Sequence, residues 1–239
     1  MTARFLVSGD TALVVEFGER IDREVSAEVL GLAARVRDAG LSGVIELVPT
    51  FRSLMVHYDP LRTSGAELRK AIEPMLSGAT RHVQPRLWRV PVCYDDELAP
   101  DLAEVAERTG RTPAEVVALH SAVPYHVYMV GFLPGYPYMG DLPAPLVLPR
   151  RSDPRVRVPP GSVAIATTIT AIYPFESPGG WHLIGTTPFR IFDARWNPPA
   201  LFAPGDAVIF EPIPRPAFDA LRDAVASGAR NLRPEEAPA

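Results

Sequence analysis

The first third of the chain alternates short apolar runs with stretches of helical spacing. The run at 12–17 predicts a buried strand. From Asp22, an expected N-cap, apolar residues recur at helical spacing as far as Gly40. Two β-rich runs, 44–48 and 54–58, follow with a hairpin-length loop between them. The pattern predicts a strand, a helix and a pair of strands.

A second helix is expected at Ser64, because Ser64 and Glu67 have the spacing of a capping box. The apolar run at 87–93 predicts one more strand. Strand, helix, strand, strand, helix, strand is the order of split βαβ units. We therefore expect a ferredoxin-like α/β sandwich over residues 1–94.

The pattern changes twice in the remainder of the chain. Two helices with clear start signals occupy 95–122, which we interpret as a helical connector. Beyond residue 123, proline and glycine interrupt strand-length apolar runs, which is typical of a compact β-barrel. We expect this barrel over 123–239, with a last short helix near 216–225 and a disordered polar tail from 234. The fold class is α+β.

Composition narrows the classes of function. The 239 residues are 47% hydrophobic and 22% charged, as in folded globular proteins, and a net charge of -4 gives no general attraction to nucleic acid or anionic membranes. The single cysteine, Cys93, excludes an internal disulfide and a Cys-rich zinc site. Neither a signal-peptide core nor a membrane-length apolar run occurs. We expect a cytoplasmic protein.

Several familiar sites are missing from the sequence. Lys70, the only lysine, lies in a helical context, so the chain has no P-loop, and a Schiff-base or biotinylated lysine is not expected. There is no Gly-x-Ser-x-Gly elbow and no His-Glu-x-x-His motif. We therefore expect no metal site and no hydrolase triad of the usual kinds.

The first candidate for binding is the loop at 131–141. Its glycines permit unusual backbone angles and its prolines stiffen it, so Gly135, Tyr136 and Tyr138 could present backbone N–H groups and hydroxyls to a small polar substrate. The alternative is a structural turn with aromatic side chains in the core.

The second candidate is an arginine cluster. Arg150, Arg155 and Arg157 could hold a carboxylate or phosphate through paired N–H donors. A solvated basic loop that pairs with surface acids is the alternative.

The third candidate is the segment 177–182. Ser177 and His182 offer a hydroxyl and an imidazole for catalysis, and Gly179 and Gly180 let the backbone approach a substrate oxyanion. For His182 alone, a buried strand histidine is the alternative.

Together these segments resemble the family known as allophanate hydrolase subunit 1, KipI-type kinase inhibitor, or B subunit of prokaryotic 5-oxoprolinase. Motifs in the same order cover nearly the whole chain. They include Gly9-Asp10, Glu46, Val48-Pro49, Tyr58-Asp59-Pro60, Pro91-Val92-Cys93-Tyr94, the Gly131 loop, Pro149-Arg150-Arg151, Val158-Pro159, Gly161-Ser162-Val163, Ile172-Tyr173-Pro174 and the segment from Ser177 to Gly185.

The resemblance implies a C-terminal cyclophilin-like β-barrel and an activity that needs partners. Members pair with a homologous C-type (KipA-type) protein, and together with an A-type protein they cleave 5-oxo-L-proline to L-glutamate at the expense of ATP, which we expect with Mg²⁺ shared among the subunits. A chain of this kind is not expected to be active alone. Two alternatives stay open: a KipI-type inhibitor that binds a sensor histidine kinase, and half of a biotin-dependent carboxyltransferase.

The chain departs from the family pattern near the third candidate. Where the family commonly has Ala-Gly-x-Gln-Thr-Gly, this chain has Thr167, Ile169 and Ala171 at the Gly, Gln and final Gly positions, and Thr186 replaces an arginine. These changes remove polar and cationic groups. We therefore expect altered substrate choice or a shift of the work to the partner chain.

Overall fold

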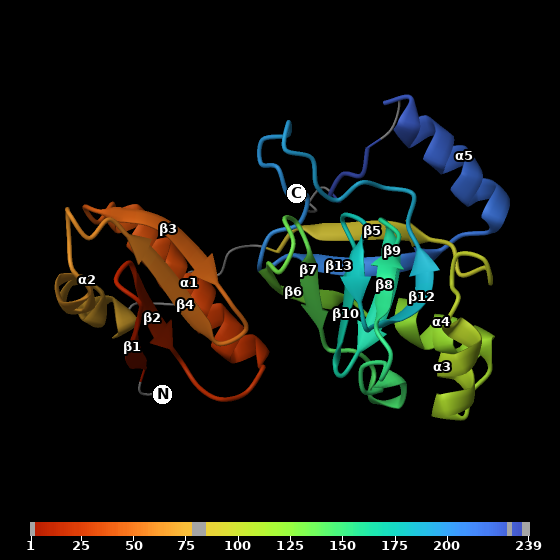
Figure 1. Cartoon of the computed structure of the whole chain (residues 1–239), viewed down its shortest axis with the longest axis horizontal. Helices are drawn as coiled ribbons and strands as arrows, with labels where there is room; N and C mark the ends of the chain where they lie inside the picture. The colour runs from red at the N-terminus through yellow and green to blue at the C-terminus, as the bar shows by residue number, and fades with distance from the viewer. Residues whose placement is uncertain (1–2, 78–84, 229–230, 236–239) are drawn as a thin grey trace. The chain divides into compact units, whose positions relative to one another are not determined.

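The computed structural model describes residues 3–77, 85–228 and 231–235. Two compact units make up the chain, 1–84 and 85–239. Both mix helices and strands, so the α+β class is confirmed (Figure 1). In the described part of the chain, no helix has both the length and the apolar character needed to cross a membrane.

The first unit is an antiparallel sheet with helices. Its elements are β1 (Arg4–Ser8), β2 (Ala12–Glu16), α1 (Arg23–Ala39), β3 (Val44–Pro49), β4 (Ser53–Tyr58), α2 (Gly65–Ile72) and a 3-10 turn, Glu73–Ser77. The strand order is β1-β2-β4-β3. Along β4, Leu54, Val56 and Tyr58 alternate with less buried residues, so one face of the sheet carries the core against α1. The Ser64–Glu67 capping box begins α2 as predicted.

The second unit is a nearly closed barrel. Its strands are β5 (Leu87–Val92), β6 (Tyr125–Val130), β7 (Pro137–Gly140), β8 (Arg155–Val158), β9 (Ser162–Ala166), β10 (Ile169–Ile172), β11 (Ser177–Gly179), β12 (His182–Thr186) and β13 (Ala207–Pro212). Seven of them form one sheet in the order β12-β9-β10-β7-β6-β13-β5. Backbone hydrogen bonds of 2.9 Å in both directions between Cys93 and Thr186 join its two edges. The expected barrel is therefore present.

The helices of the second unit lie outside the strands (Figure 1). They are α3 (Leu102–Thr109), α4 (Pro113–Ser121), a 3-10 turn (Ala144–Leu146) and α5 (Arg215–Ala226). The last confirms the helix expected near 216–225. Of the predicted tail, residues 236–239 lie outside the described residues.

Three sequence expectations need correction. The strand predicted at 87–93 belongs to the second unit, where β5 pairs in parallel with β13, so the division falls after residue 84 rather than 94. The helices of 95–122 are not a mere connector, because Leu102, Val105 and Val116 are buried in the barrel core. The first unit also begins with a strand hairpin, since β1 precedes the strand predicted at 12–17.

Candidate functional site

A small pocket of about 190 Å³ in the second unit gathers half of the predicted site residues. Four segments surround it: the loop between β6 and β7, the loop before β8, the end of β10, and the turn from β11 to β12. Its lining consists of Phe132, Tyr136, Tyr138, Arg150, Arg151, Pro154, Tyr173, Pro178, Gly179, Gly180 and Trp181. The three sequence candidates thus meet at one place.

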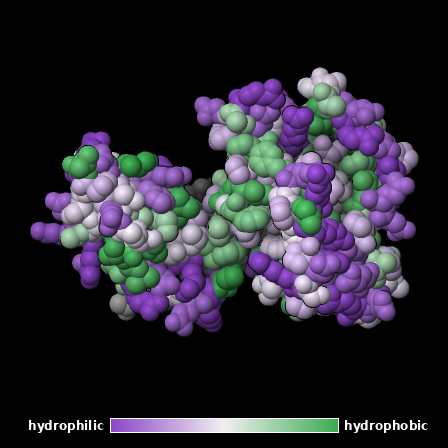
Figure 2. All heavy atoms as spheres, in the orientation of Figure 1, coloured by the Kyte–Doolittle hydropathy of each residue, from purple (hydrophilic) through white to green (hydrophobic). Residues whose placement is uncertain are grey.

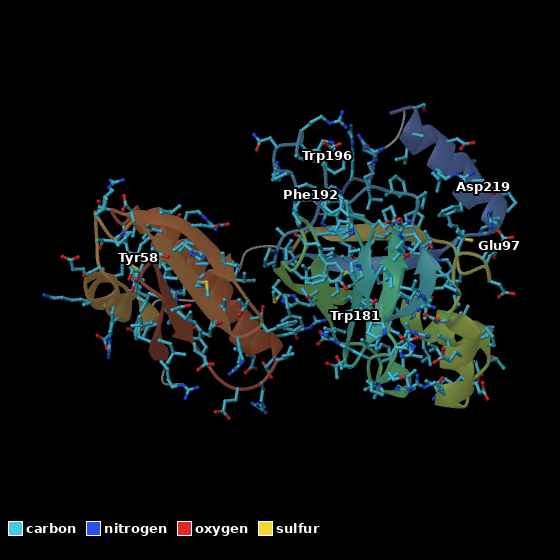
Figure 3. The ribbon with its side chains drawn as sticks, viewed as in Figure 1. Tyr58, Glu97, Trp181, Phe192, Trp196 and Asp219 are labelled. Atoms are coloured by element: carbon cyan, nitrogen blue, oxygen red, sulfur yellow. The ribbon has the colours of Figure 1, made fainter. Side chains whose placement is uncertain are left out.

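Aromatic rings form most of the wall of the small pocket. Tyr136 contacts Tyr138, Tyr173 and Trp181 at ring-centroid distances of 5.0, 5.1 and 6.0 Å. Trp181 (Figure 3) also lies 6.0 Å from Tyr138. Burial raises the pKa of all three tyrosine hydroxyls, so they stay protonated at neutral pH and can donate hydrogen bonds. Such a wall suits a small ring with polar edges.

Glycine is required at two positions around these rings. A Cβ at Gly179 would overlap Tyr173, whose ring carbon Cζ would lie 2.9 Å away. Gly135 has a φ of +77° and a Cβ there would fall 2.6 Å from Cβ of Phe192. At Gly180 the nearest atom to a Cβ would be 3.6 Å away, an ordinary contact. Gly179 therefore keeps the pocket open, whereas Gly135 shapes the loop behind it.

Arg150 is the cation that faces the small pocket. Its guanidinium lies 5.9 Å from the centroid of the Trp181 ring, and its charge opposes the rise in the pKa of Tyr138 that burial causes. In the described part of the chain no carboxylate pairs with it, in contrast to Arg151, Arg155 and Arg157. It can therefore bind an anion.

A buried carboxylate holds two other arginines, and we call this group the Asp101 clamp. Arg155 donates to both carboxylate oxygens of Asp101, at 2.8 and 2.5 Å, and Arg151 donates to Oδ1 at 3.1 Å. The backbone N–H of Leu183 donates to Oδ2 at 2.6 Å. The backbone N–H of Arg151 donates to the Gly180 carbonyl at 2.8 Å. The Asp101 clamp thus ties the start of α3 to the pocket loops.

His182 lies beside the Asp101 clamp and away from the pocket lining. It is fully buried on β12, and its Nε2 donates to the Pro149 carbonyl at 3.0 Å. Its Nδ1 has no hydrogen-bond partner among the described residues and lies 4.0 Å from Oε1 of Glu104. Glu104 accepts from Arg151 at 2.8 Å, and burial acts against the lowering of its pKa by Arg108 and Arg151. The imidazole therefore supports the loop that carries Arg150.

The structure separates the predicted site residues into two groups. Tyr136, Tyr138, Arg150, Gly179 and Gly180 line the small pocket. Ser177, His182, Gly135, Arg155 and Arg157 do not.

Two members of the second group differ in their surroundings. The Ser177 hydroxyl is buried, and no described residue forms a hydrogen bond with it. The Arg157 side chain is 79% exposed and pairs with Glu176 at 3.6 Å.

Sequence reasoning does not single out four residues that matter here. Phe132, Tyr173 and Trp181 line the pocket, and each lies inside a motif whose aromatic content could have pointed to it. Asp101 is different, because it lies about fifty positions before the arginines it binds. No local signal links these positions.

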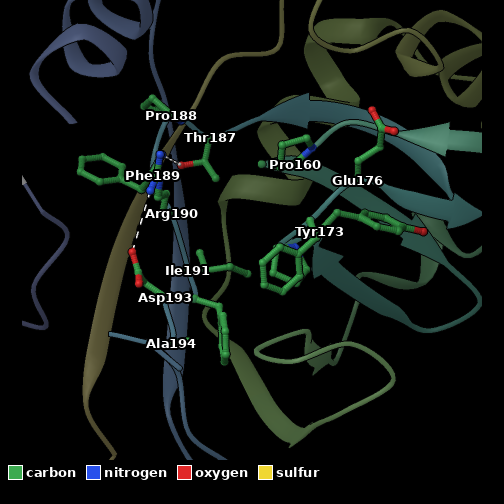
Figure 4. Close-up of a pocket in the computed structure, with 14 residues that line it drawn as sticks. Pro160, Tyr173, Glu176, Thr187, Pro188, Phe189, Arg190, Ile191, Asp193 and Ala194 are labelled. Carbon is green, nitrogen blue, oxygen red and sulfur yellow. Dashed lines mark hydrogen bonds and ion pairs between the residues drawn. The ribbon is translucent and has the colours of Figure 1, made fainter. Parts of the chain in front are cut away.

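A larger pocket of about 640 Å³ adjoins the small one through Tyr173, which lines both (Figure 4). Phe175 and Phe192 meet edge to face there at 5.4 Å. In Figure 3, Phe192 lies well apart from Trp181. Arg190 approaches Asp193 at 3.8 Å, and hydrogen bonds from Arg195 lower the pKa of that carboxyl. The face of the second unit seen in Figure 2 mixes hydrophilic and hydrophobic residues.

A second buried histidine lies inside the barrel. His120 stacks on Phe210 at 4.6 Å, and its ring nitrogens bond to the Tyr94 hydroxyl at 2.9 Å and the Thr170 hydroxyl at 3.1 Å. Burial lowers the pKa of His120 to about 3, so the ring is neutral at physiological pH. Within 3–77, 85–228 and 231–235, no group of three or more His, Cys, Asp or Glu side chains could hold a metal ion.

Comparison with known proteins gives a consistent family. The family model described as "Carboxyltransferase domain, subdomain C and D" matches residues 3–202. The chain is 37% identical over 237 residues to the 5-oxoprolinase B subunit of Bacillus subtilis (strain 168), covering 93% of this chain and 99% of that protein. It is 38% identical over 214 residues to the 5-oxoprolinase B subunit of Escherichia coli O157:H7, covering 88% and 96%.

Solved structures extend the comparison to the fold. The structure of TTHA0988 has a TM-score of 0.76 and 36% identity over 85% of this chain, which spans 40% of that longer chain. The urea amidolyase of Kluyveromyces lactis has a TM-score of 0.80 over 98% of this chain and 16% of its own, at 20% identity. The second likeness concerns the fold alone.

Proposed function

We propose, from the premise that this chain belongs to the family of 5-oxoprolinase B subunits, that it is the B subunit of an ATP-dependent complex that cleaves 5-oxo-L-proline to L-glutamate. The observation that carries the proposal is 37% identity to a 5-oxoprolinase B subunit over 99% of that protein's length. A match from end to end, rather than over one motif, supports the same role.

The small pocket is the part of the substrate site that this chain would supply. Its aromatic wall would cover the five-membered ring, and Arg150 would bind the carboxylate. The hydroxyl of Tyr138, kept protonated by burial, would donate a hydrogen bond to the lactam oxygen. Because Gly179 has no side chain, the backbone there would lie against the substrate ring. Ser177 and His182 would act as structural supports, since neither lines the pocket.

ATP fits this chain only in part. Arg150 can contact an anion, but the described residues contain no cluster of three or more His, Cys, Asp or Glu side chains that could hold a magnesium ion. We therefore propose that Mg²⁺ and the nucleotide are held largely by two partner proteins, the homologous C-type one and the A-type one. When bound, ATP would supply the phosphoryl group that activates the lactam oxygen. The chain would not turn over substrate alone, and its location would be cytoplasmic.

Reconstitution tests the proposal. The chain is purified together with its C-type partner, the A-type partner is added, and glutamate release from 5-oxoproline is followed with and without ATP. We expect ATP-dependent release by the full set and none by this chain alone. Arg150→Gln should lower kcat/KM by about tenfold or more, since a hydrogen bond to a charged group is worth roughly 1.5–3 kcal/mol.

Arg222→Gln is the matched control, because Arg222 lies on α5 and pairs with Asp219 at 3.0 Å, outside the pocket. Its kcat/KM should equal that of the unaltered complex. Background glutamate release from an intact complex of verified composition would refute the proposed function.

A further inference from the structure

Three arginines lie close together at the small pocket, but they differ in their hydrogen-bond and ion-pair partners. Arg150 and Arg151 line the pocket, and Arg155 begins the adjacent strand β8. The sequence predicts Arg150 and Arg155 alike as anion ligands and does not single out Arg151. Their partners in the structure distinguish them.

The Asp101 clamp takes two of the three positive charges. Both terminal nitrogens of Arg155 donate to the Asp101 carboxylate, and Nη1 of Arg151 donates to Asp101 and to Glu104. The Asp101 side chain is only 3% exposed, and those of Arg151 and Arg155 are 22% and 26% exposed. A carboxylate so enclosed keeps its arginines because releasing them would leave a buried charge unpaired. Asp101 and Glu104 therefore balance the positive charges of Arg151 and Arg155, although Nε of Arg151 has no hydrogen-bond partner among the described residues.

Arg150 is left as the one pocket cation that no described carboxylate pairs with. Its guanidinium lies over the ring of Trp181, which lines the pocket. One guanidinium matches one carboxylate with two parallel hydrogen bonds. A phosphate group carries about 1.5–2 negative charges, so a single unbalanced guanidinium neutralises it less completely than it neutralises one carboxylate.

The size of the pocket agrees with a small ligand. Its volume of about 190 Å³ lies below the roughly 300–1,000 Å³ of sites for drug-sized molecules. A small ring that carries one acid group fits these limits better than a nucleotide does.

We propose that the small pocket selects a monocarboxylate over a phosphate, and that Asp101 sets this selectivity by balancing the positive charges of Arg151 and Arg155. Asp101 is thus a specificity-determining residue that does not touch the ligand. The inference rests on the proposed function only in treating the small pocket as a ligand site.

Binding to the full chain tests the idea with two simple probes. Cyclopentanecarboxylate stands for the ring acid and inorganic phosphate for the dianion, and affinities are measured by calorimetry. Cyclopentanecarboxamide, the uncharged analogue, should bind on the order of tenfold more weakly than the acid. Arg150→Gln should remove that difference.

The variant Asp101→Asn examines the specificity role directly. Asparagine keeps an oxygen for the Leu183 N–H but loses the charge that holds the arginines. We expect the ratio of phosphate to carboxylate affinity to rise on the order of tenfold. In the double variant Asp101→Asn with Arg155→Gln, the ratio of phosphate to carboxylate affinity should fall back most of the way to its value in the unaltered chain. Loss of structure alone would not produce this reversal.

The inference does not depend on Asp101→Asn folding. Arg155→Gln alone should leave carboxylate affinity within about twofold, whereas Arg150→Gln should lower it about tenfold. Arg157→Gln is the control outside the pocket and should change neither affinity.

Two outcomes would overturn the inference. Phosphate binding as tightly as the carboxylate in the unaltered chain is one, and an equal loss in the Arg155 and Arg150 variants is the other. Either is separable from failure of the proposed function, which is judged by glutamate release in the reconstituted complex and not by these probes.

Discussion

Asp101 and His120 are both buried in the second unit, yet their surroundings are opposite in kind. Asp101 lies next to arginines whose side chains reach partly to solvent. His120 lies among Phe210, Tyr125 and two hydroxyls in the barrel interior, and none of the described carboxylates bonds to it. The first group of side chains is built from opposite charges, and the second is held together by neutral hydrogen bonds.

The contrast shows where this barrel tolerates charge. At its edge, guanidinium groups can satisfy a buried carboxylate while their other N–H groups reach water, so the cost of burial is shared. In the interior, burial without an opposite charge keeps a titratable ring neutral. Variants at the two places should therefore differ in the size and in the pH dependence of their effects.

The largest effect is expected for Asp101→Ala. Arg151, Arg155 and the Leu183 N–H would all lose their acceptor, and breaking a buried ion pair in this way costs about 3–5 kcal/mol. Urea unfolding of the full chain, followed by tryptophan fluorescence of the second unit, measures the change. Asp219→Ala removes a carboxylate that is 37% exposed and should cost about 1 kcal/mol or less. Equal costs for the two variants would contradict the enclosed role of Asp101.

His120 should make stability fall in acid. Its pKa is about 3 in the folded chain and about 6.5 when unfolded, so the unfolded chain binds more protons between these values. The contribution of His120 to the free energy of unfolding is therefore fully present above about pH 6.5. It declines by up to roughly 1.4 kcal/mol per pH unit as the pH falls towards 3.

The variant His120→Gln isolates this contribution. Its unfolding free energy is measured in urea at several pH values from about 7 to 4. The slope of this free energy against pH should be smaller than in the unaltered chain by close to the value for one bound proton. His57→Gln, in the first unit, should leave the transition of the second unit unchanged. Parallel pH profiles for His120→Gln and the unaltered chain would rule out a neutral buried ring.

A methyl group in the small pocket gives an intermediate effect. Gly179→Ala would push against Tyr173, and such overpacking costs about 1–3 kcal/mol, or roughly 5- to 150-fold in kcat/KM if it falls on substrate binding. Gly180→Ala is the matched control, because its Cβ has room, and should lose less than about threefold. Steady-state kinetics of the reconstituted complex compares them. Equal losses would place the ligand elsewhere.

Ser177→Ala should have the smallest effect. No described residue bonds to the buried hydroxyl, so its removal should leave stability unchanged or raise it by up to about 1 kcal/mol. Because Ser177 does not line the pocket, kcat of the reconstituted complex should stay within about twofold. Thermal unfolding and steady-state kinetics check both expectations. A large loss of kcat in a well-folded variant would restore Ser177 as a catalytic residue.

Sequence is informative wherever structure is set by near neighbours. The strand predicted at 54–58 and the capping box at Ser64 are properties of a few consecutive residues, and both are confirmed. The run at 87–93 is recognisable as a strand, but its assignment to the first unit is wrong. Its partner β13 starts more than a hundred residues later, and an apolar run carries no information about which strand it pairs with.

The same limit applies to the site. The motifs occur in the order typical of one family over nearly the whole chain, and the membership of this chain in that family is confirmed. It also points to Tyr136, Arg150 and Gly179, which the structure brings to one pocket. Arg150 and Arg155, in contrast, are alike in sequence and differ only because Asp101 lies beside one of them. That difference depends on the packing of α3 against β12, which local residue patterns do not encode.

The segment that follows α5 has a consequence for how the barrel can be joined to other chains. The C-terminal segment returns to the start of this unit, where Glu235 donates its backbone N–H to the Leu87 carbonyl at 2.7 Å. The first strand of the barrel and the segment at 231–235 therefore lie next to each other. A barrel with adjacent ends can be fused to another chain at either end, inserted into a longer polypeptide or circularly permuted without a break in its sheet.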